Sequence, residues 1–193
     1  MSPVAARRLT EPSPFHFTVD DYYMLAEIGV LGENTRTELI EGEIIEMPPS
    51  SPEHSGHVDA VTDIFHGKLQ SKYRIRCQMA VRVSQITEPE PDIAVFKARA
   101  DKYTKSHPTP ADALLVVEVS KSTLDYDLKR KAGLYAKAGI REYWVLDLNA
   151  RRLHVFTRPV GGIWKQHRTL TPREEVQSAT VPELKLKVSE LFV

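Results

Sequence analysis

Residues 113–120, ALLVVEVS, form an almost uninterrupted apolar run that contains one carboxylate, Glu118. A run of this length and composition is typical of a β-strand buried in the centre of a sheet. Moving an isolated charge into such an interior costs several kcal/mol unless another group pairs with it. The sequence therefore predicts a central strand and, close to it, a partner for Glu118.

The pattern of apolar and polar residues predicts most of the other elements. A half-buried hairpin is expected over residues 37–49, with its turn near Glu41 and Gly42. Further strands are expected at residues 79–84, 91–96, 141–147, 151–157 and 163–170. Helices are expected at residues 18–29, 52–68 and 124–138. This order predicts an α/β fold in which helices flank a mixed β-sheet.

The length of 193 residues suffices for one compact core and is short for two. We expect a flexible, proline-rich tail over residues 1–17 and a single domain over residues 18–193. Cys77 is the only cysteine, so an intrachain disulfide is impossible. No apolar segment approaches the roughly 20 residues that span a bilayer, and the first residues lack the apolar centre of a secretory signal. The expected location is the cytoplasm, away from membranes.

The 26 basic and 26 acidic side chains cancel, so overall charge gives no reason to bind nucleic acid or an anionic membrane. The charges are unevenly distributed, however. Residues 1–64 have a formal charge of −9, whereas residues 121–152 have a formal charge of +4. We therefore expect that the basic stretch could meet a polyanion on one face of the protein.

Two carboxylates lie where strands should be buried. Asp92 directly follows Pro91 at the start of one predicted strand, and Glu118 lies near the end of the next. If these strands pair, the two carboxylates converge, and they repel each other unless a proton or a divalent cation lies between them. Oxygen ligands favour Mg²⁺ or Mn²⁺. Taken singly, each has a structural alternative: Asp92 as a strand-start residue and Glu118 as a paired core carboxylate.

The helix expected at residues 124–138 supplies a candidate cation. At about 100° per residue, Lys131 falls within the apolar arc of this helix. Lys129, Arg130 and Lys137 fall outside that arc and are expected in solvent. A lysine that points toward the sheet would pair with a buried anion, although a lysine can also extend from an apolar stripe to solvent.

Several motifs together resemble the Uma-type family of bacterial endonucleases, in the PD-(D/E)xK, restriction-endonuclease-like superfamily. They are PD at 91–92, VEVS at 117–120, the D-x-x-x-K-x-x-x-Y pattern at 127–135 followed by EYW, and the upstream ELIEGEII and PPSSPEH. The similarity covers about residues 18–157. It implies a restriction-endonuclease-like core with a mixed sheet flanked by helices, and a nuclease that requires Mg²⁺ or Mn²⁺.

The resemblance also assigns roles to particular residues. It implies that Asp92 and Glu118 hold the metal and that the carbonyl of Val119 adds a ligand. The superfamily motif has a lysine two residues after the glutamate, where this chain has Ser120. The Uma-type pattern lacks it too, and a lysine matching Lys131 is thought to replace it.

Four further residues have two possible interpretations or are secondary candidates. Lys121, displaced by one residue from the motif position, is a second candidate for the lysine. Glu38 resembles the acid from the first element that often completes such a site, but it could equally be an exposed hairpin charge. His54 matches the family's PEH, yet a lone histidine on an apolar helix face is more often a core residue, and His57 is interpreted in the same way.

The expected function is hydrolysis of phosphodiester bonds in nucleic acid, with DNA preferred over RNA, by a homodimer. The alternative is an inactive nuclease-fold module for binding or structure, which the neutral charge and Ser120 would favour. A glycan hydrolase is less well supported, because the sequence offers no aromatic-rich sugar platform beyond Tyr143 and Trp144, and packing explains these two better.

Overall fold

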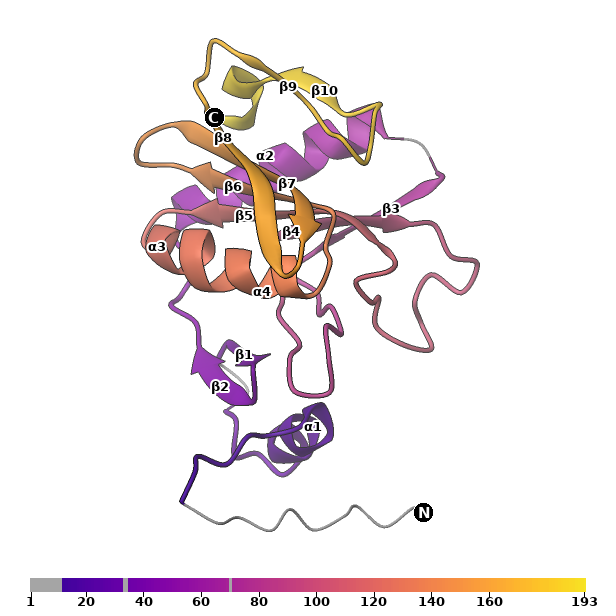
Figure 1. The fold of residues 1–193 in the computed structure, drawn as a ribbon, viewed down its shortest axis with the longest axis vertical. Helices are drawn as coiled ribbons and strands as arrows, with labels where there is room; N and C mark the ends of the chain where they lie inside the picture. Colours follow the sequence, from indigo (N-terminus) through magenta and orange to yellow (C-terminus); the bar gives the residue numbers. More distant parts are fainter. Residues whose placement is uncertain (1–11, 33–34, 70) are drawn as a thin grey trace.

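A six-stranded mixed β-sheet forms the centre of the protein (Figure 1). The computed structural model describes residues 12–32, 35–69 and 71–193. The strands follow the order β3-β4-β5-β6-β7-β8 across the sheet. Their bounds are Tyr73–Cys77, Ile93–Lys97, Ala113–Ser120, Glu142–Asp147, Arg152–Val160 and Ile163–Leu170. Only β5 and β6 pair in parallel in this sheet, which confirms the predicted α/β class with a mixed sheet.

Helices cover both faces of this sheet, as Figure 1 shows. The 17-residue helix α2 (Pro52–Lys68) packs on one face through Val58, Val61 and Phe65. The other face is covered by a helical segment that consists of α3 (Leu124–Tyr126), a π-helical turn η1 (Asp127–Lys131) and α4 (Ala132–Lys137). This segment joins β5 to β6, because a parallel pair requires a crossover connection.

Strand β5 is the central strand that the apolar run predicts. All eight of its residues are buried, and their side chains alternate between the two faces. Leu115, Val117 and Val119 enter the core beneath α2, whereas Val116 faces the α4 side. Since Glu118 alternates with Val117 and Val119, it lies on the α4 side.

Local capping explains where the expected helices begin and end. Helix α1 (Val19–Glu27) starts with a capping box in which Thr18 and Asp21 bond each other's backbone N–H. The Ser51 hydroxyl accepts the N–H of His54 and begins α2. Gly139, with φ of +75°, follows the end of α4, as expected for a glycine C′ residue.

The expected hairpin consists of β1 (Thr37–Ile40) and β2 (Glu43–Glu46). Glu41 and Gly42 form its turn with positive φ values of 53° and 82°. Strand β1 is tied to the main body by the Glu88 N–H, which donates to the Leu39 carbonyl at 2.7 Å. The hairpin thereby brings its buried residues toward the sheet.

The prediction of a strand at residues 79–84 is wrong. The strand that pairs with β4 is β3, Tyr73–Cys77, and it ends because Gln78 adopts a φ of +49°. After this turn, Val81 donates to the carbonyl of Pro89 at 2.9 Å within an irregular arm that projects from the sheet. The alternation in MAVRVS therefore reflects an extended arm with Ala80 and Val81 buried.

The C-terminal segment follows the six-stranded sheet and packs against its core. It forms a small antiparallel pair, β9 (Glu175–Gln177) and β10 (Lys185–Lys187), followed by the 3₁₀ turn η2 (Val188–Leu191). These elements extend the core beneath α2.

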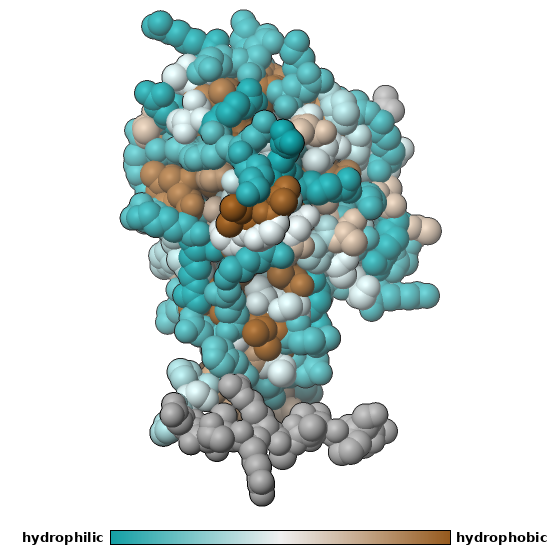
Figure 2. All heavy atoms as spheres, in the orientation of Figure 1, coloured by the Kyte–Doolittle hydropathy of each residue, from teal (hydrophilic) through white to brown (hydrophobic). Residues whose placement is uncertain are grey.

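The face of the molecule in Figure 2 is mostly hydrophilic, with small separate hydrophobic patches.

The predicted division into a tail and a single domain stays a prediction, since residues 1–11 lie outside the described part of the chain. The described end of the expected tail is bonded to the hairpin turn, because Phe17 donates to the carbonyl of Gly42 at 2.9 Å. In the described part of the chain, no helix is long and apolar enough to cross a membrane.

Candidate active site

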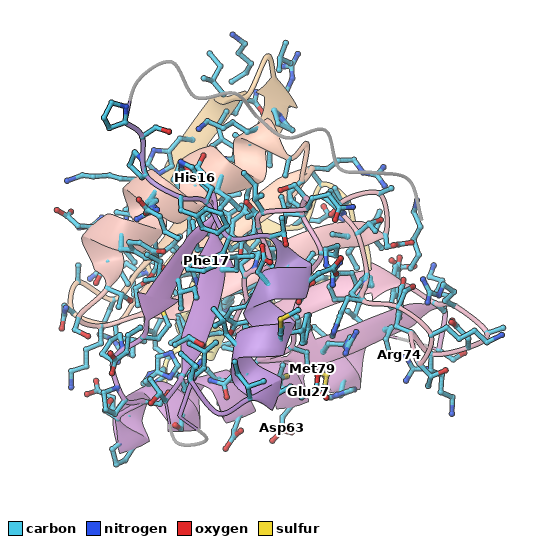
Figure 3. All side chains as sticks on the ribbon, turned by 90° about the horizontal axis from the view of Figure 1, so that it is seen from below. His16, Phe17, Glu27, Asp63, Arg74 and Met79 are labelled. Carbon is cyan, nitrogen blue, oxygen red and sulfur yellow. The ribbon has the colours of Figure 1, made fainter. Side chains whose placement is uncertain are left out.

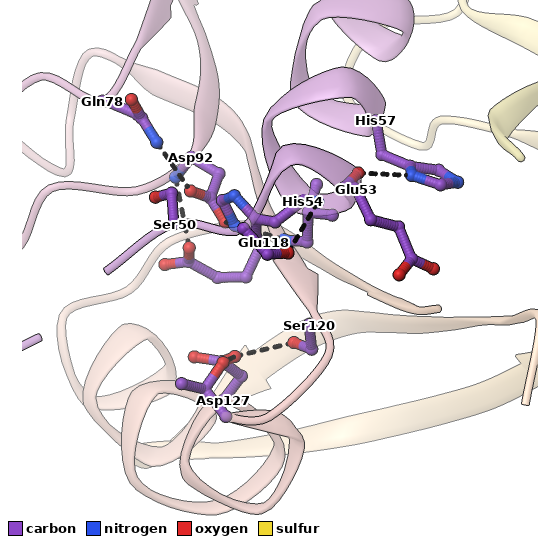
Figure 4. A network of polar contacts seen from close by, with 12 residues as sticks. Ser50, Glu53, His54, His57, Gln78, Asp92, Glu118, Ser120 and Asp127 are labelled. Carbon is purple, nitrogen blue, oxygen red and sulfur yellow. Dashed lines mark hydrogen bonds and ion pairs between the residues drawn. The ribbon is translucent and has the colours of Figure 1, made fainter. Parts of the chain in front are cut away.

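Asp92 and Glu118 converge at one end of two neighbouring strands of the sheet, where β4 begins and β5 ends. The antiparallel register pairs Ile93 with Val117, so the two carboxylates are neighbours. The Asp92 N–H donates to Glu118 Oε2 at 3.1 Å, and the Val119 N–H donates to Asp92 Oδ2 at 2.9 Å. Figure 4 shows these side chains around the start of α2. The structure thus brings together the two acids that the sequence singles out.

Lys131 reaches this pair from the π-helical turn. Its ammonium Nζ lies 3.0 Å from Glu118 Oε1 and 3.0 Å from Glu38 Oε1. The three side chains are only 2 to 3% exposed. Glu38 is therefore a buried member of the cluster, and its interpretation as an exposed hairpin charge is wrong. The four candidate catalytic residues meet in one place.

The π-helical turn also places an acidic residue, Asp127, in the same region. Its Oδ2 accepts hydrogen bonds from the Ser120 hydroxyl at 2.6 Å and from the Thr123 hydroxyl at 2.7 Å. Ser120 occupies the position of the superfamily lysine and is fully buried. It serves here as a hydrogen-bond donor to Asp127.

Tyr135 lies one turn further along and donates to Glu118 Oε1 at 3.1 Å. Asp127, Lys131 and Tyr135 are spaced by four residues, and all three are buried against the sheet. The sequence analysis used the whole D-x-x-x-K-x-x-x-Y pattern for the family resemblance, but assigned a role only to its lysine. The i, i+4, i+8 spacing is the signal that could have found the other two, because such residues share one helix face.

His54 extends the cluster from the first turn of α2. Its Nε2 lies 3.1 Å from Asp92 Oδ2, and its buried Nδ1 has no partner among the described residues. It is therefore a polar neighbour of Asp92, and its interpretation as a satisfied core residue is wrong. His57 fits that interpretation, since it is 5% exposed and its ring bonds the carbonyl of Glu53 at 2.7 Å.

Lys121, the second candidate for the lysine, points away from the buried cluster. It is exposed and forms an ion pair with Glu53 on α2. Lys121 lies at the rim of a pocket of about 160 Å³ that gives access to the site. Acidic side chains dominate its interior: Glu38, Glu90, Asp92, Glu118 and Asp127 line it.

The excess of carboxylates in this pocket favours the binding of positive charge. Burial raises the pKa of Glu118 well above its ordinary value, against the opposite effect of the Lys131 ammonium. Burial alone would lower the pKa of Lys131, but the charges of Glu118 and Glu38 hold it well above its usual value. The two directions have different main causes, since burial disfavours the charged form of Glu118, whereas the surrounding carboxylates favour the charged form of Lys131.

Asp92 behaves differently because it has dedicated donors. Burial would raise the pKa of Asp92, but the hydrogen bond and charge of His54, together with the Val119 N–H, hold it below its ordinary value. The second oxygen, Oδ1, has only a long contact of 3.4 Å with Gln78 Nε2. Asp92 is thus kept ionised with one oxygen weakly bonded.

The donor chemistry of the site fits a hard divalent cation. Asp92 Oδ1 is weakly bonded, and Glu38 Oε2 is buried without a hydrogen-bond partner among the described residues. Carboxylate oxygens are the ligands that Mg²⁺ and Mn²⁺ prefer. As the described side chains stand, no group of three or more His, Cys, Asp or Glu residues is arranged to hold an ion. The contact of the Val119 carbonyl with a metal stays a prediction.

Comparison with known proteins identifies the family. A family model named Uma2, described as "Putative restriction endonuclease", matches residues 19–189. The chain belongs to the Uma2 family. Among curated proteins, no relative matches this sequence.

The fold of this Uma2 member is also similar to that of a solved structure. It is described as "a putative nuclease belonging to DUF820 from Anabaena variabilis" and superposes with a TM-score of 0.72. The two are 19% identical, and the match covers 91% of this chain and 97% of the other. The predicted family and restriction-endonuclease-like fold class are confirmed.

Proposed function

We propose that this Uma2 member is a divalent-metal-dependent endonuclease that hydrolyses phosphodiester bonds, with DNA as its preferred substrate. The observation that supports it best is the convergence of Asp92, Glu118, Glu38 and Lys131 in one acidic pocket. Membership of a family described as restriction endonucleases supports the same reaction class.

Asp92 and Glu118, with the carbonyl of Val119, would hold Mg²⁺ or Mn²⁺. Such an ion, when bound, supplies Lewis-acid polarisation of a phosphate and lowers the pKa of a coordinated water. The residues of the chain prepare the site for it. The Val119 N–H and His54 orient Asp92 and keep it ionised.

Lys131 has two tasks in this proposal. It neutralises part of the carboxylate charge, which otherwise would repel an incoming phosphate. It also lies where an ammonium could orient the attacking water or stabilise the charge that develops on the phosphate. Tyr135 assists by bonding the oxygen of Glu118 that Lys131 contacts, which fixes the glutamate side chain.

An inactive nuclease-fold module is the second candidate. The absence of a preformed three-ligand group among the described residues favours it. Binding of Mn²⁺ separates the two candidates. Titration calorimetry should detect a site in the wild type that Glu118→Gln weakens, and a wild type without such a site would favour the inactive module.

Cleavage of plasmid and oligonucleotide substrates with Mg²⁺ or Mn²⁺ tests the enzyme directly. Asp92→Ala should abolish cleavage, whereas Asp125→Ala should retain it, because Asp125 is an exposed carboxylate on α3 whose ion pair among the described residues is with Lys129. Undiminished cleavage by Asp92→Ala would overturn the proposal. Parallel DNA and RNA substrates test the preference for DNA.

A homodimer and a cytoplasmic location complete the proposal. Enzymes that cut both strands of a duplex commonly work as symmetric pairs. Light scattering during gel filtration would measure the mass, and a monomer at all concentrations would exclude the dimer. Fractionation of the producing cells would test the location.

A further inference from the structure

The edge strand β3 carries two arginines on the face of the sheet to which Asp92 belongs. Tyr73, Ile75 and Cys77 pack against the core beneath α2. Because side chains alternate along a strand, Arg74 and Arg76 point to the other face. Their cross-strand partners confirm this, since Phe96 and Ala94 belong to the core on the α4 side.

Neither guanidinium has a carboxylate within ion-pair distance in the described part of the chain. Arg74 Nε and Arg76 Nη1 are buried N–H groups without an acceptor there. The recorded bond of Arg76 runs from Nε to the thioether of Met79 at 3.1 Å, a weak acceptor. Burial lowers the pKa of Arg76, and the opposite effect of Tyr103 is smaller. An unmet guanidinium of this kind favours an external anion.

Five of the eight cations in the basic stretch 121–152 are, in contrast, already in ion pairs, and one of these five is Lys131 in the active-site cluster. They lie along the α3–α4 segment and just before it, and their partners belong mostly to the acidic N-terminal half. The pairs are Lys121 with Glu53, Lys129 with Asp125, Arg130 with Glu43 and Lys137 with Glu41. The positive charge of Lys121 and of the α3–α4 segment is thus neutralised within the molecule, whereas Arg141, Arg151 and Arg152 form no ion pair in the described part of the chain.

Gln78 connects the two arginines to the proposed active site. Its side chain is exposed, and Nε2 lies 3.4 Å from Asp92 Oδ1 (Figure 4). Residues two apart on a strand are separated by about 6.6 Å, so Arg76 and Arg74 form a row that leads away from Asp92 along β3. Figure 3 labels Arg74 toward one side of the molecule and Met79 nearer its centre.

We propose that Arg74 and Arg76 bind the phosphate backbone of the DNA substrate beside the cleavage site. This inference rests on the proposed nuclease function and names the surface that the substrate uses. Arginine suits this task because its planar fork donates two parallel hydrogen bonds to a phosphate. Contacts of this kind position the duplex and carry no sequence information themselves.

The salt dependence of binding tests the proposal. Fluorescence anisotropy of a labelled duplex in EDTA, between about 50 and 200 mM NaCl, measures the slope of log Kobs against log salt. Arg74→Ala/Arg76→Ala should reduce this slope by about 1.8, since each phosphate contact contributes about 0.9. The matched control Lys129→Ala/Lys137→Ala removes the same charge from paired positions and should leave the slope unchanged.

Two further measurements keep the outcomes distinct. Arg74→Lys/Arg76→Lys retains both positive charges and should keep most of the slope. A retained slope attributes the loss in Arg74→Ala/Arg76→Ala to the missing charges and not to misfolding. An unchanged slope in Arg74→Ala/Arg76→Ala overturns the inference, while cleavage by the wild type with Mn²⁺ would leave the nuclease standing. A wild type that neither binds nor cleaves DNA overturns both. Equal losses in the paired-lysine control would also refute the assignment, because they would reflect net charge alone.

Discussion

Replacement of Lys131 by methionine tests the ionic cluster, since it removes the charge while keeping a long apolar side chain. Lys131 contacts two carboxylates, Glu38 and Glu118, and all three side chains are at most 3% exposed. Removing one partner of a buried ion pair costs about 3–5 kcal/mol, because the remaining charge is uncompensated. Since two carboxylates lose the same partner here, we expect a loss of unfolding free energy near the upper end, about 4–5 kcal/mol at pH 7.

The deficit should depend on pH with a defined sign. Burial already raises the pKa of Glu118, and loss of the ammonium removes the group that lowers it. A carboxyl whose pKa is raised in the folded state favours folding below its unfolded pKa and loses this contribution as the pH rises through the folded pKa. The deficit of Lys131→Met relative to the wild type should therefore shrink between pH 7 and 5, by up to about 1.4 kcal/mol per pH unit from Glu118.

Urea unfolding at pH 5, 6 and 7 measures this effect. The double variant Glu118→Gln/Lys131→Met should recover at least about 1 kcal/mol relative to the sum of the single variants, because the two residues interact directly. Lys129→Met, on the exposed side of the same turn, should change stability by less than about 0.5 kcal/mol. A loss below about 1 kcal/mol in Lys131→Met, without pH dependence, would refute a buried ionic role for Lys131.

Two other substitutions test parts of the cluster. Glu38→Gln should lower the apparent Mn²⁺ affinity in cleavage assays by roughly 10-fold, as expected for a group that surrounds the ligands; an unchanged Mn²⁺ dependence would remove Glu38 from the site. Ser120→Ala should reduce the unfolding free energy by about 1–3 kcal/mol, because the buried Asp127 loses one of its two hydroxyl donors. Urea midpoints that coincide with the wild type would show that Thr123 alone satisfies this carboxylate.

Local patterns predicted the residues that neighbouring strands bring together. Asp92 and Glu118 meet because β4 and β5 pair directly, and their strands were recognisable as apolar runs. Lys131 was selected from a helical projection at a regular 100° per residue. It is buried as expected, although the turn that contains it is π-helical.

Local patterns did not predict the contacts between residues that are distant in the sequence. Lys131 and Glu38 are 93 residues apart in the chain, and no periodicity links them. The location of His54 against Asp92 depends on how α2 crosses the sheet, which its apolar face does not specify. The strand at β3 was missed because YRIRC alternates as MAVRVS does, and the sharp turn at Gln78 has no glycine to mark it.

The π-helical turn η1 allows the direction of the Lys131 side chain and the packing of α4 to be set separately, which a regular helix would not allow. Bonds from i to i+5 accommodate one extra residue, so the residues before and after the turn keep independent orientations. The Lys131 side chain can therefore be aimed at the carboxylates while Leu134 and Tyr135 keep their places in the core. A single-residue deletion within Asp127–Lys131 would remove the extra residue and restore a regular helix, which would change the direction of the side chains inside the turn, Lys131 among them. The register of this segment, as much as the identity of its lysine, thus determines whether the site is assembled.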